Sequence, residues 1–405
     1  MLIDAINGII RTITTGSRAY KLWVGVLLLL AAIGISFVVK QASEGLIVTN
    51  MRNQVSWGWY IANFTFLVGV AAAAVVLVIP YYVYKYKPIG NIVLIGEVMA
   101  VAAVSMCLMF ILLDMGSPER FWHLLPGIGI FNFPQSILTW DVVVLNLYLF
   151  LNLFLVIYAL ARIYAGKPYK TGFIWPFIIF SIPAAISIHT VTAFLYAGLP
   201  SRPFWNAAIL APRFIASAFS SGPAFMLIIF QIIRKRTKLE ITDESLFKVA
   251  ELITWAMAFN LFFLIAEIYK EVYSATDHIA ALNYLYYGLQ GHDQLVPWIW
   301  TAVIFNSIAF LILLIPTLRR SFIPLNVACV LIFIGVYIEK GIGLVFPGFI
   351  PGTLGEIYEY FPNSLELWIS VGVWSIGLLI FTLFAKVAIA IKTGEIGHAN
   401  PAEEH

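Results

Sequence analysis

Between residues 114 and 123 the chain gathers side chains that could move protons beside a flat ring. The segment reads Asp114-Met115-Gly116-Ser117-Pro118-Glu119-Arg120-Phe121-Trp122-His123 and follows a long apolar run. Asp114 could hold a proton, Arg120 could pair with it, and His123 titrates near neutral pH. Trp122 and Phe121 offer flat apolar surface. A quinone headgroup needs such a set. The alternative interpretation of these residues is an interfacial salt bridge that caps a helix.

Other ionisable side chains lie within the long apolar runs. Inside a membrane-spanning helix such a group costs at least about 2.5–3.5 kcal/mol near the centre, which makes it a functional candidate. We therefore expect a set of five residues to take part in proton transfer: Glu97, Asp114, Asp141, His189 and Glu267.

Structural roles are open for some of these groups. His189 has hydroxyl-bearing neighbours on both sides, so a hydrogen-bonded structural histidine is the alternative there. Glu267 and Lys270 are one helical turn apart and predict an i,i+3 ion pair that reaches the interface. The adjacent Glu339 and Lys340 predict the same kind of interfacial pair.

The composition requires a lipid environment. The 405 residues are 61% hydrophobic and only 11% charged, whereas soluble domains carry about 25% charged residues. A net charge of +3 gives no basis for nucleic-acid binding. The cysteines, Cys107 and Cys329, lie in separate apolar runs, so no iron–sulfur cluster or zinc site is expected. Paired axial ligands for haem are not expected from the six histidines, which are His123, His189, His278, His292, His398 and His405.

Ten runs are long enough to cross a membrane, because a spanning helix needs about 20 mostly apolar residues. Their continuous apolarity differs from the alternation of barrel strands. The predicted fold is therefore all-α, a single polytopic membrane domain over residues 1–405. The runs cover roughly residues 20–39, 56–84, 91–113, 139–164, 173–197, 208–233, 247–272, 295–317, 323–346 and 365–391.

A short internal repeat suggests how these helices are grouped. Tyr60-Ile61-Ala62-Asn63-Phe64 resembles Phe214-Ile215-Ala216-Ser217, and a glycine follows each stretch. The repeat predicts two four-helix bundles, helices 2–5 and 6–9, flanked by helices 1 and 10. The corresponding parts of the chain are residues 1–55, 56–200, 201–350 and 351–405.

The basic residues predict the orientation of the chain. Ten crossings put both termini on one side, and most of the 24 Lys and Arg residues belong to that side. The positive-inside rule places this side in the cytoplasm. The first helix is expected to be retained as an anchor, because no small-residue cleavage site follows it. Long loops on the other side, such as 114–138 and 347–364, are expected to dock a partner or to fold over the helix ends.

Four motifs resemble the NrfD / polysulfide-reductase family of membrane subunits. The resemblance covers nearly the whole chain, and its ten-helix layout is most similar to the DsrP (HmeB-type) subunits of sulfate-reducer membrane complexes. The Asp-x-Gly-x-Pro-x-Arg-Phe-Trp-His stretch is the most specific element. The motifs span residues 57–64, 114–123, 189–194 and 212–219.

The resemblance implies a subunit without a redox metal of its own that binds a quinone, commonly menaquinone, near the extracytoplasmic face of the cell membrane. It also implies a partner with several iron–sulfur clusters on that face, further membrane subunits with b- and c-type cytochromes, and a role in sulfate respiration with proton translocation. Where some relatives use a histidine on helix 2, this chain has Tyr60 and Asn63 nearby. The expected quinone-binding residues are Asp114, Arg120, Trp122, His123, Tyr60 and Asn63.

Two other functions fit parts of the pattern. A secondary transporter would use internal repeats and intramembrane charges, although the charged residues here gather near one face. A purely structural anchor, surrounded by lipid, would need no quinone chemistry.

Overall fold

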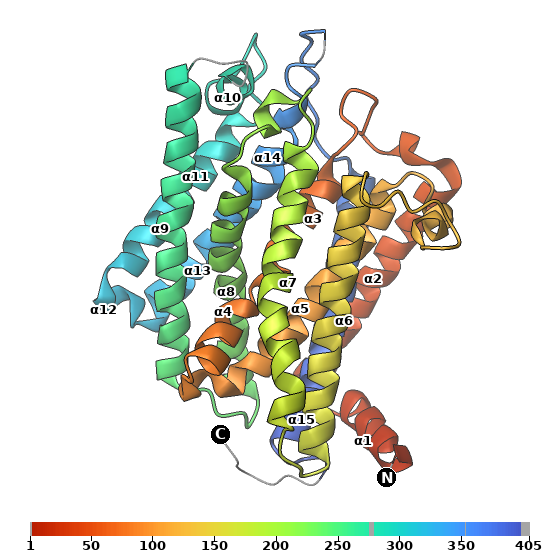
Figure 1. The fold of residues 1–405 in the computed structure, drawn as a ribbon, viewed down its shortest axis with the longest axis vertical. Coiled ribbons are helices and arrows are strands. Elements are labelled where there is room, and N and C mark those ends of the chain that lie inside the picture. Colours follow the sequence, from red (N-terminus) through yellow and green to blue (C-terminus); the bar gives the residue numbers. More distant parts are fainter. Residues whose placement is uncertain (1, 275–278, 353, 398–405) are drawn as a thin grey trace.

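The computed structural model describes residues 2–274, 279–352 and 354–397, and this part of the chain is helical without a β-strand (Figure 1). It contains ten helices that are long and apolar enough to cross a membrane, which confirms the predicted all-α polytopic fold. The spans are α2 (Arg18–Glu44), α3 (Trp59–Ala72) continued by α4 (Val75–Val78) and η2 (Ile79–Val83), η3 (Lys87–Ile89) with α5 (Gly90–Asp114), α6 (Ile137–Tyr164), α7 (Thr171–Ala197), α8 (Leu210–Arg236), α9 (Asp243–Ser274), α11 (Val296–Leu314), α13 (Phe322–Tyr337) continued by η6 (Ile338–Ile342), α14 (Gly343–Val345) and η7 (Pro347–Phe349), and α15 (Ser364–Lys392).

Helices dominate because a lipid environment offers no water to the backbone, so each segment must satisfy its own N–H and C=O groups. The remaining short helices lie before or between the spans. They are α1 (Leu2–Thr14), η1 (Leu46–Val48), η4 (Pro118–Leu124), η5 (Pro203–Trp205), α10 (Ile279–Tyr286) and α12 (Pro316–Arg319). In Figure 1, α1 and the end of α15 lie at the bottom, which we name the α1 end, and η4 and α10 lie near the top, which we name the η4 end.

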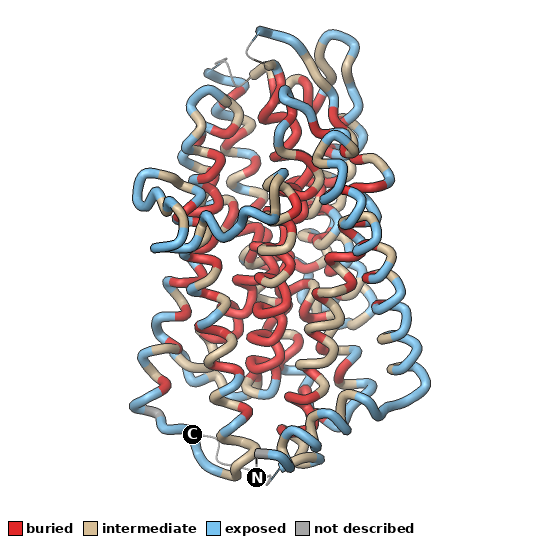
Figure 2. Tube along the Cα trace, turned by 90° about the vertical axis from the view of Figure 1, so that its right-hand side faces the viewer, coloured by how far each residue is buried: buried red, intermediate tan, exposed pale blue. Residues whose placement is uncertain are grey.

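The α3 helix forms the centre of the molecule. Every residue from Tyr60 to Ala72 is buried, whereas α2 is exposed over most of its surface (Figure 2). Helices α3, α5, α6 and α7 pack on one another, as do α8, α9, α11 and α13. The α3–α8 contact joins these two groups, and α15 packs against both α2 and α5.

The α3–α8 contact is close because α8 presents Gly222 to α3. A Cβ atom at Gly222 would lie 2.3 Å from the Cβ of Ala73, where the regular turns of α3 end. A second irregularity is the π-helical turn η6, and such turns often occur at functional sites. Its adjacent residues Glu339 and Lys340 are both buried.

The peripheral helix α2 is attached to α15 through a glycine pair. A Cβ at Gly34 would lie 2.4 Å from the Cα of Gly372, whereas Gly25, on the same helix, has nothing within 4 Å. We predict that Gly34→Val lowers the free energy of unfolding by about 1–3 kcal/mol, because the larger side chain must separate two backbones. Gly25→Val is the matched control. Equal melting temperatures of the two variants in detergent would contradict this contact.

Candidate functional site

Asp114 is the last residue of α5 and lies at the η4 end of the molecule. Its Oδ1 atom is buried and has no hydrogen-bond partner among the described residues. Asp114 lies close enough to Tyr60 and Glu366 for their charges to interact. A buried polar atom without a partner is rare in a well-packed core, so this carboxyl group is a candidate for binding or proton chemistry.

Tyr60 connects α3 to the same corner. Its hydroxyl donates to Oε1 of Gln41, on α2, at 2.6 Å, and the Gln41 amide nitrogen donates to the carbonyl of Leu113 at 2.9 Å. Tyr60 is fully buried and Gln41 nearly so. The side chain next to Asp114 is therefore held in place from two helices.

A second carboxyl group, Glu366, completes the corner from α15. Its Oε2 accepts backbone N–H bonds from Asn50 and Asn363, each at 3.0 Å, and its Oε1 accepts from the hydroxyl of Tyr360. The Tyr360 hydroxyl in turn accepts the N–H of Trp59 at 2.9 Å. Three donors thus hold one buried carboxyl group in place.

Tyr360 also lines a surface hollow of about 270 Å³ at the η4 end. The hollow is formed by two segments that are far apart in the sequence, and its lining residues are Asn50, Arg52, Val55, Ile357, Tyr358, Glu359, Tyr360 and Phe361. The hydrogen-bonded chain through Tyr360 and Glu366 thus reaches from this hollow to the neighbourhood of Tyr60 and Asp114.

The predicted pairing of Arg120 with Asp114 is wrong. Arg120 forms its ion pair with Glu119 at 3.8 Å, and its side chain is 71% exposed. Gly116 adopts a positive φ of 74°, which favours glycine, and Pro118 then starts η4 outside the bundle. On η4 the exposed rings of Trp122 and His123 pack on each other with centroids 3.9 Å apart.

Asn63 lies one helical turn below Trp59 and is buried among aromatic rings. Its Oδ1 accepts from the hydroxyl of Tyr337 at 3.0 Å and from Nε1 of Trp374 at 2.9 Å, while its amide donates to the Trp59 carbonyl. Asn63 therefore connects α3 to α13 and α15.

Two predicted proton-transfer residues face the interior between α6 and α7. Thr192 donates to Oδ1 of Asp141 at 2.9 Å, and Oδ2 of Asp141 is buried without a partner among the described residues. Nδ1 of His189 lies 3.3 Å from the carbonyl of Ala185, and its buried Nε2 likewise lacks a described partner. The structure gives both groups a free buried atom.

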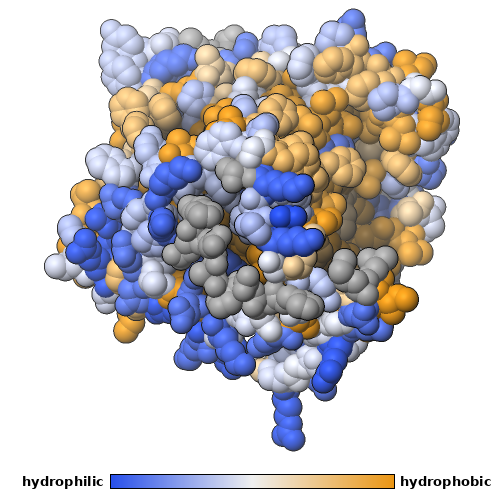
Figure 3. All heavy atoms as spheres, turned by 60° about the horizontal axis from the view of Figure 1, so that its bottom comes forward, coloured by the Kyte–Doolittle hydropathy of each residue, from blue (hydrophilic) through white to orange (hydrophobic). Residues whose placement is uncertain are grey.

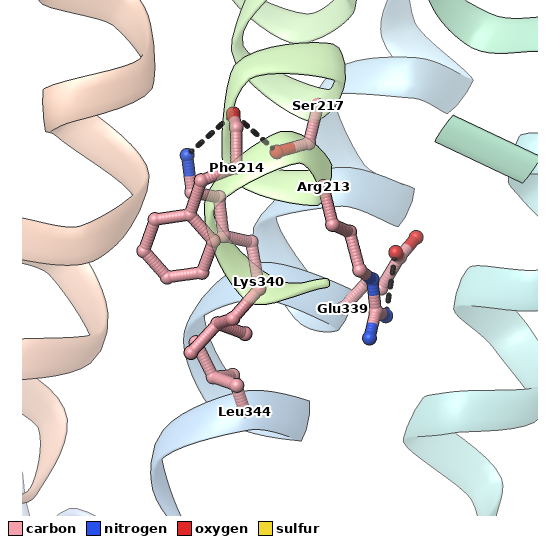
Figure 4. Close-up of a pocket in the computed structure, with 7 residues that line it drawn as sticks. Arg213, Phe214, Ser217, Glu339, Lys340 and Leu344 are labelled. Carbon is pink, nitrogen blue, oxygen red and sulfur yellow. Dashed lines mark hydrogen bonds and ion pairs between the residues drawn. The ribbon is translucent and has the colours of Figure 1, made fainter. Parts of the chain in front are cut away.

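The other group of helices contains an ion-pair network centred on Arg213 of α8 (Figure 4). Arg213 pairs with Glu267 of α9 and, at 2.8 Å, with Glu339 of η6. Asn306 of α11 donates to Glu339 at 2.7 Å. A cavity of about 10 Å³, room for about one water molecule, lies beside Arg213, Glu339 and Lys340.

This network corrects the predicted local pairs. Glu267 pairs with Arg213 across two helices, and Lys270 pairs instead with its neighbour Glu271 at 2.9 Å. Lys340 points away from Glu339, donates to the carbonyl of Phe214 at 3.3 Å and lies over its ring (Figure 4). The two adjacent charges of η6 therefore lie on different sides of the turn (Figure 4).

Glu97 lies buried toward the α1 end of α5. Lys392 of α15 is near enough for the two charges to interact, and it donates to the carbonyl of Gly90 at 3.1 Å. The sequence-predicted residues thus occupy separate places along the molecule. Of the predicted quinone set, Tyr60 and Asp114 share one corner with further buried polar groups, Asn63 is buried one turn further along α3, and the other three members lie exposed on η4.

Sequence reasoning missed Gln41, Glu366, Tyr360 and Arg213 as members of these networks. The Asn363-x-x-Glu366 spacing is a capping-box pattern, and the structure contains that box. No group of three or more His, Cys, Asp or Glu side chains in the described ranges is placed to hold a metal ion. His278, His398 and His405 lie outside the described residues.

Comparison with known proteins identifies relatives of the whole chain. A protein of Halobacterium salinarum, provisionally named as a membrane component of dimethyl sulfoxide reductase, is 27% identical over 88% of each chain. A component of the selenate reductase of Mesobacillus selenatarsenatis is 25% identical over 95% of this chain and 98% of its own. The Hdr-like menaquinol oxidoreductase integral membrane subunit of Archaeoglobus fulgidus is 25% identical over 89% and 92%.

The family model described as polysulphide reductase, NrfD matches residues 47–350. This range contains the segment from Asp114 to His123, the α3 helix and the Arg213 network. The match covers well over half of the chain. The protein is a member of the NrfD polysulphide reductase family.

Proposed function

We propose that this protein is the quinone-reactive membrane subunit of a respiratory oxidoreductase complex in the cell membrane. It exchanges electrons between menaquinone and an iron–sulfur partner. The observation that carries the proposal is the unpartnered buried carboxyl oxygen of Asp114 beside Tyr60 and Glu366. The relative named as a menaquinol oxidoreductase subunit supports the choice of menaquinone.

The residues around Asp114 fit a quinone headgroup. A protonated Asp114 donates a hydrogen bond to a carbonyl oxygen, and an ionised Asp114 accepts a proton from a hydroxyl. Tyr60 and Asn63, fixed by Gln41, Tyr337 and Trp374, form the inner wall. A bound quinol supplies two electrons and two protons when it is oxidised. The two electrons would pass to the iron–sulfur partner. Asp114 would take up the two protons one after the other and pass them to the Glu366–Tyr360 chain, which leads toward the hollow at the η4 end.

Two ring side chains of η4 belong to the outer rim of this site. Trp122 and His123 pack on each other at the water boundary, where their rings guide the headgroup. Arg120, paired with Glu119, contributes a charged contact toward a partner.

Proton transfer across the membrane uses the buried groups deeper in the bundle. Asp141 and His189 each carry an unpartnered atom, and Glu267 belongs to the Arg213 network. Glu97, near Lys392, lies on the route to the α1 end. Ionisable side chains at membrane depth are costly, which favours a functional role.

The partner with several iron–sulfur clusters docks at the η4 end, which faces away from the cytoplasm, and both termini lie in the cytoplasm. Membrane subunits with b- and c-type cytochromes and a place in sulfate respiration belong to the same proposal. A secondary transporter or a structural anchor would leave the Asp114 corner without quinone chemistry.

Purification of the full chain from its native membrane in a mild detergent tests this assignment. We expect menaquinone in the lipid extract, at about one molecule per chain, together with an iron–sulfur subunit identified by mass spectrometry. Recovery of the chain alone, with quinone no more abundant than in bulk lipid, would instead favour the anchor.

A further inference from the structure

The apolar face of α1 has two parts, and the protein covers only one of them. Ile9 and Ile13 pack against the hydrophobic core. Ile3, Ile6 and Ile10 are 73%, 47% and 53% exposed. Their spacing of three and four residues places them along one face of a helix with 3.6 residues per turn.

The remaining side of α1 is polar. Asp4 and Arg11 lie on it, and Asn7, three residues from Ile10, borders the apolar face; all three are exposed. A helix with one apolar face and one polar face lies in the plane of a membrane interface, with the apolar face toward the acyl chains.

The position of α1 agrees with this geometry. Figure 1 shows α1 beside the bottom of the helix bundle, next to the start of α2. Figure 3, in which that end comes forward, shows hydrophilic side chains gathered over the end and hydrophobic ones over the flank. The first residues of α2 continue the apolar flank, because Leu22 and Trp23 are exposed on it.

The turn from α1 to α2 is held by hydrogen bonds and carries basic side chains. The ammonium group of Lys386, on α15, donates to the carbonyl of Thr15 and lies 3.4 Å from the centre of the Tyr20 ring. The Tyr20 hydroxyl donates to the carbonyl of Ile13 at 2.8 Å. Arg18 and Lys21, at the start of α2, are exposed beside this turn.

The acid that interacts with this turn, Glu395, is paired with another cation. Glu395 interacts with Lys386, but it forms its ion pair with Lys238 at 3.5 Å. Arg11, Arg18, Lys21 and Lys386 therefore give one corner of the α1 end a concentrated positive charge, directly beside the exposed isoleucines.

We propose that α1 and the α1–α2 turn form a binding site for anionic phospholipid. Ile3, Ile6 and Ile10 lie among the acyl chains, while Arg18 and Lys21 reach the phosphate groups. Basic clusters beside an amphipathic helix recognise anionic headgroups through charge. The site anchors the N-terminal end of α2, a helix that otherwise contacts the protein mainly through α15.

Spin-label accessibility in a bilayer tests the position of α1. The native cysteines, Cys107 and Cys329, are buried, so Ile6→Cys and Asp4→Cys, which lie about 160° apart around the helix, can each be labelled singly in the full chain reconstituted with phosphatidylglycerol. The label at position 6 should collide more with oxygen, and the label at position 4 more with a water-soluble nickel complex. If both labels prefer the nickel complex, α1 lies in water and the proposal is overturned.

Lipid retention tests the charge. The double variant Arg18→Gln/Lys21→Gln should lower the ratio of retained phosphatidylglycerol to phosphatidylcholine about 30-fold in native mass spectrometry, since each of the two cations near an anionic surface contributes about 1 kcal/mol and about 1.4 kcal/mol is a factor of ten. Lys235→Gln/Arg236→Gln, at the end of α8, removes equal exposed charge as the control. Equal ratios in the two variants would overturn the proposal.

Inorganic phosphate separates a lipid site from an ion site. In phosphatidylcholine alone, phosphate should not raise the melting temperature of the unmodified chain, whereas added phosphatidylglycerol should. Equal stabilisation by phosphate would mean that the corner binds an ion, and the lipid proposal would fail.

Discussion

Asp114→Asn should reduce quinol oxidation by the intact complex by about 100-fold or more, because a positioned proton-transfer group contributes 10²–10⁴ to a rate. The amide keeps the size of the side chain but cannot take up the proton. Stopped-flow measurement of electron transfer from a menaquinol analogue gives the rate. Co-purification of the partner subunit verifies that the complex is still assembled.

Glu119→Gln is the matched control for that measurement. Glu119 is an acid five residues further along, and its side chain is 69% exposed on η4. It should leave the rate nearly unchanged. If both variants turn over at the unmodified rate, the corner at the end of α5 has no part in the chemistry.

Arg213→Met should produce the largest loss of stability in the molecule, about 3–5 kcal/mol, because Glu267 and Glu339 would lose the cation that they share. The side chains of all three residues are nearly inaccessible to solvent. Thermal unfolding in detergent, followed by fluorescence, measures the change.

Two further variants make this prediction specific. Lys238→Met removes a cation whose side chain is 82% exposed and whose partner, Glu395, is 53% exposed, and it should cost less than about 1 kcal/mol. Arg213→Met/Glu267→Gln/Glu339→Gln should recover most of the stability, since no unpaired charge then remains buried. A single Arg213→Met variant as stable as Lys238→Met would refute the network.

The ten spans could be predicted from the sequence because a lipid environment imposes long apolar runs. Charges inside those runs were identified as unusual for the same reason. A hydropathy window long enough for a spanning helix averages the apolar and polar faces of a short amphipathic helix, so α1 was not predicted as an element.

The partners of the buried charges could not be predicted. Spacing along one helix offered Lys270 to Glu267 and Lys340 to Glu339, yet both acids pair with Arg213 of another helix. Local spacing reports only neighbours on the same helix. The π-helical turn η6, which separates Glu339 from Lys340, has no sequence signal that we could use.

The residues around Asp114 could likewise be predicted only in part. Asp114 and Tyr60 were predicted from their types and from the family resemblance, and the structure brings them together. Glu366 lies about 250 residues further along the chain, and only the packing of α15 beside α5 makes it a neighbour. Arg120 was expected at Asp114, but the turn at Gly116 carries it outward.

The most direct test of the quinone site is photolabelling of the intact complex with an azido-menaquinone, followed by peptide mapping. We predict label on the peptides that contain Tyr60 and Asp114, and its loss when excess unlabelled menaquinone is added. Label confined to other helices, with the same pattern in the presence of competitor, would contradict a quinone site at the end of α5.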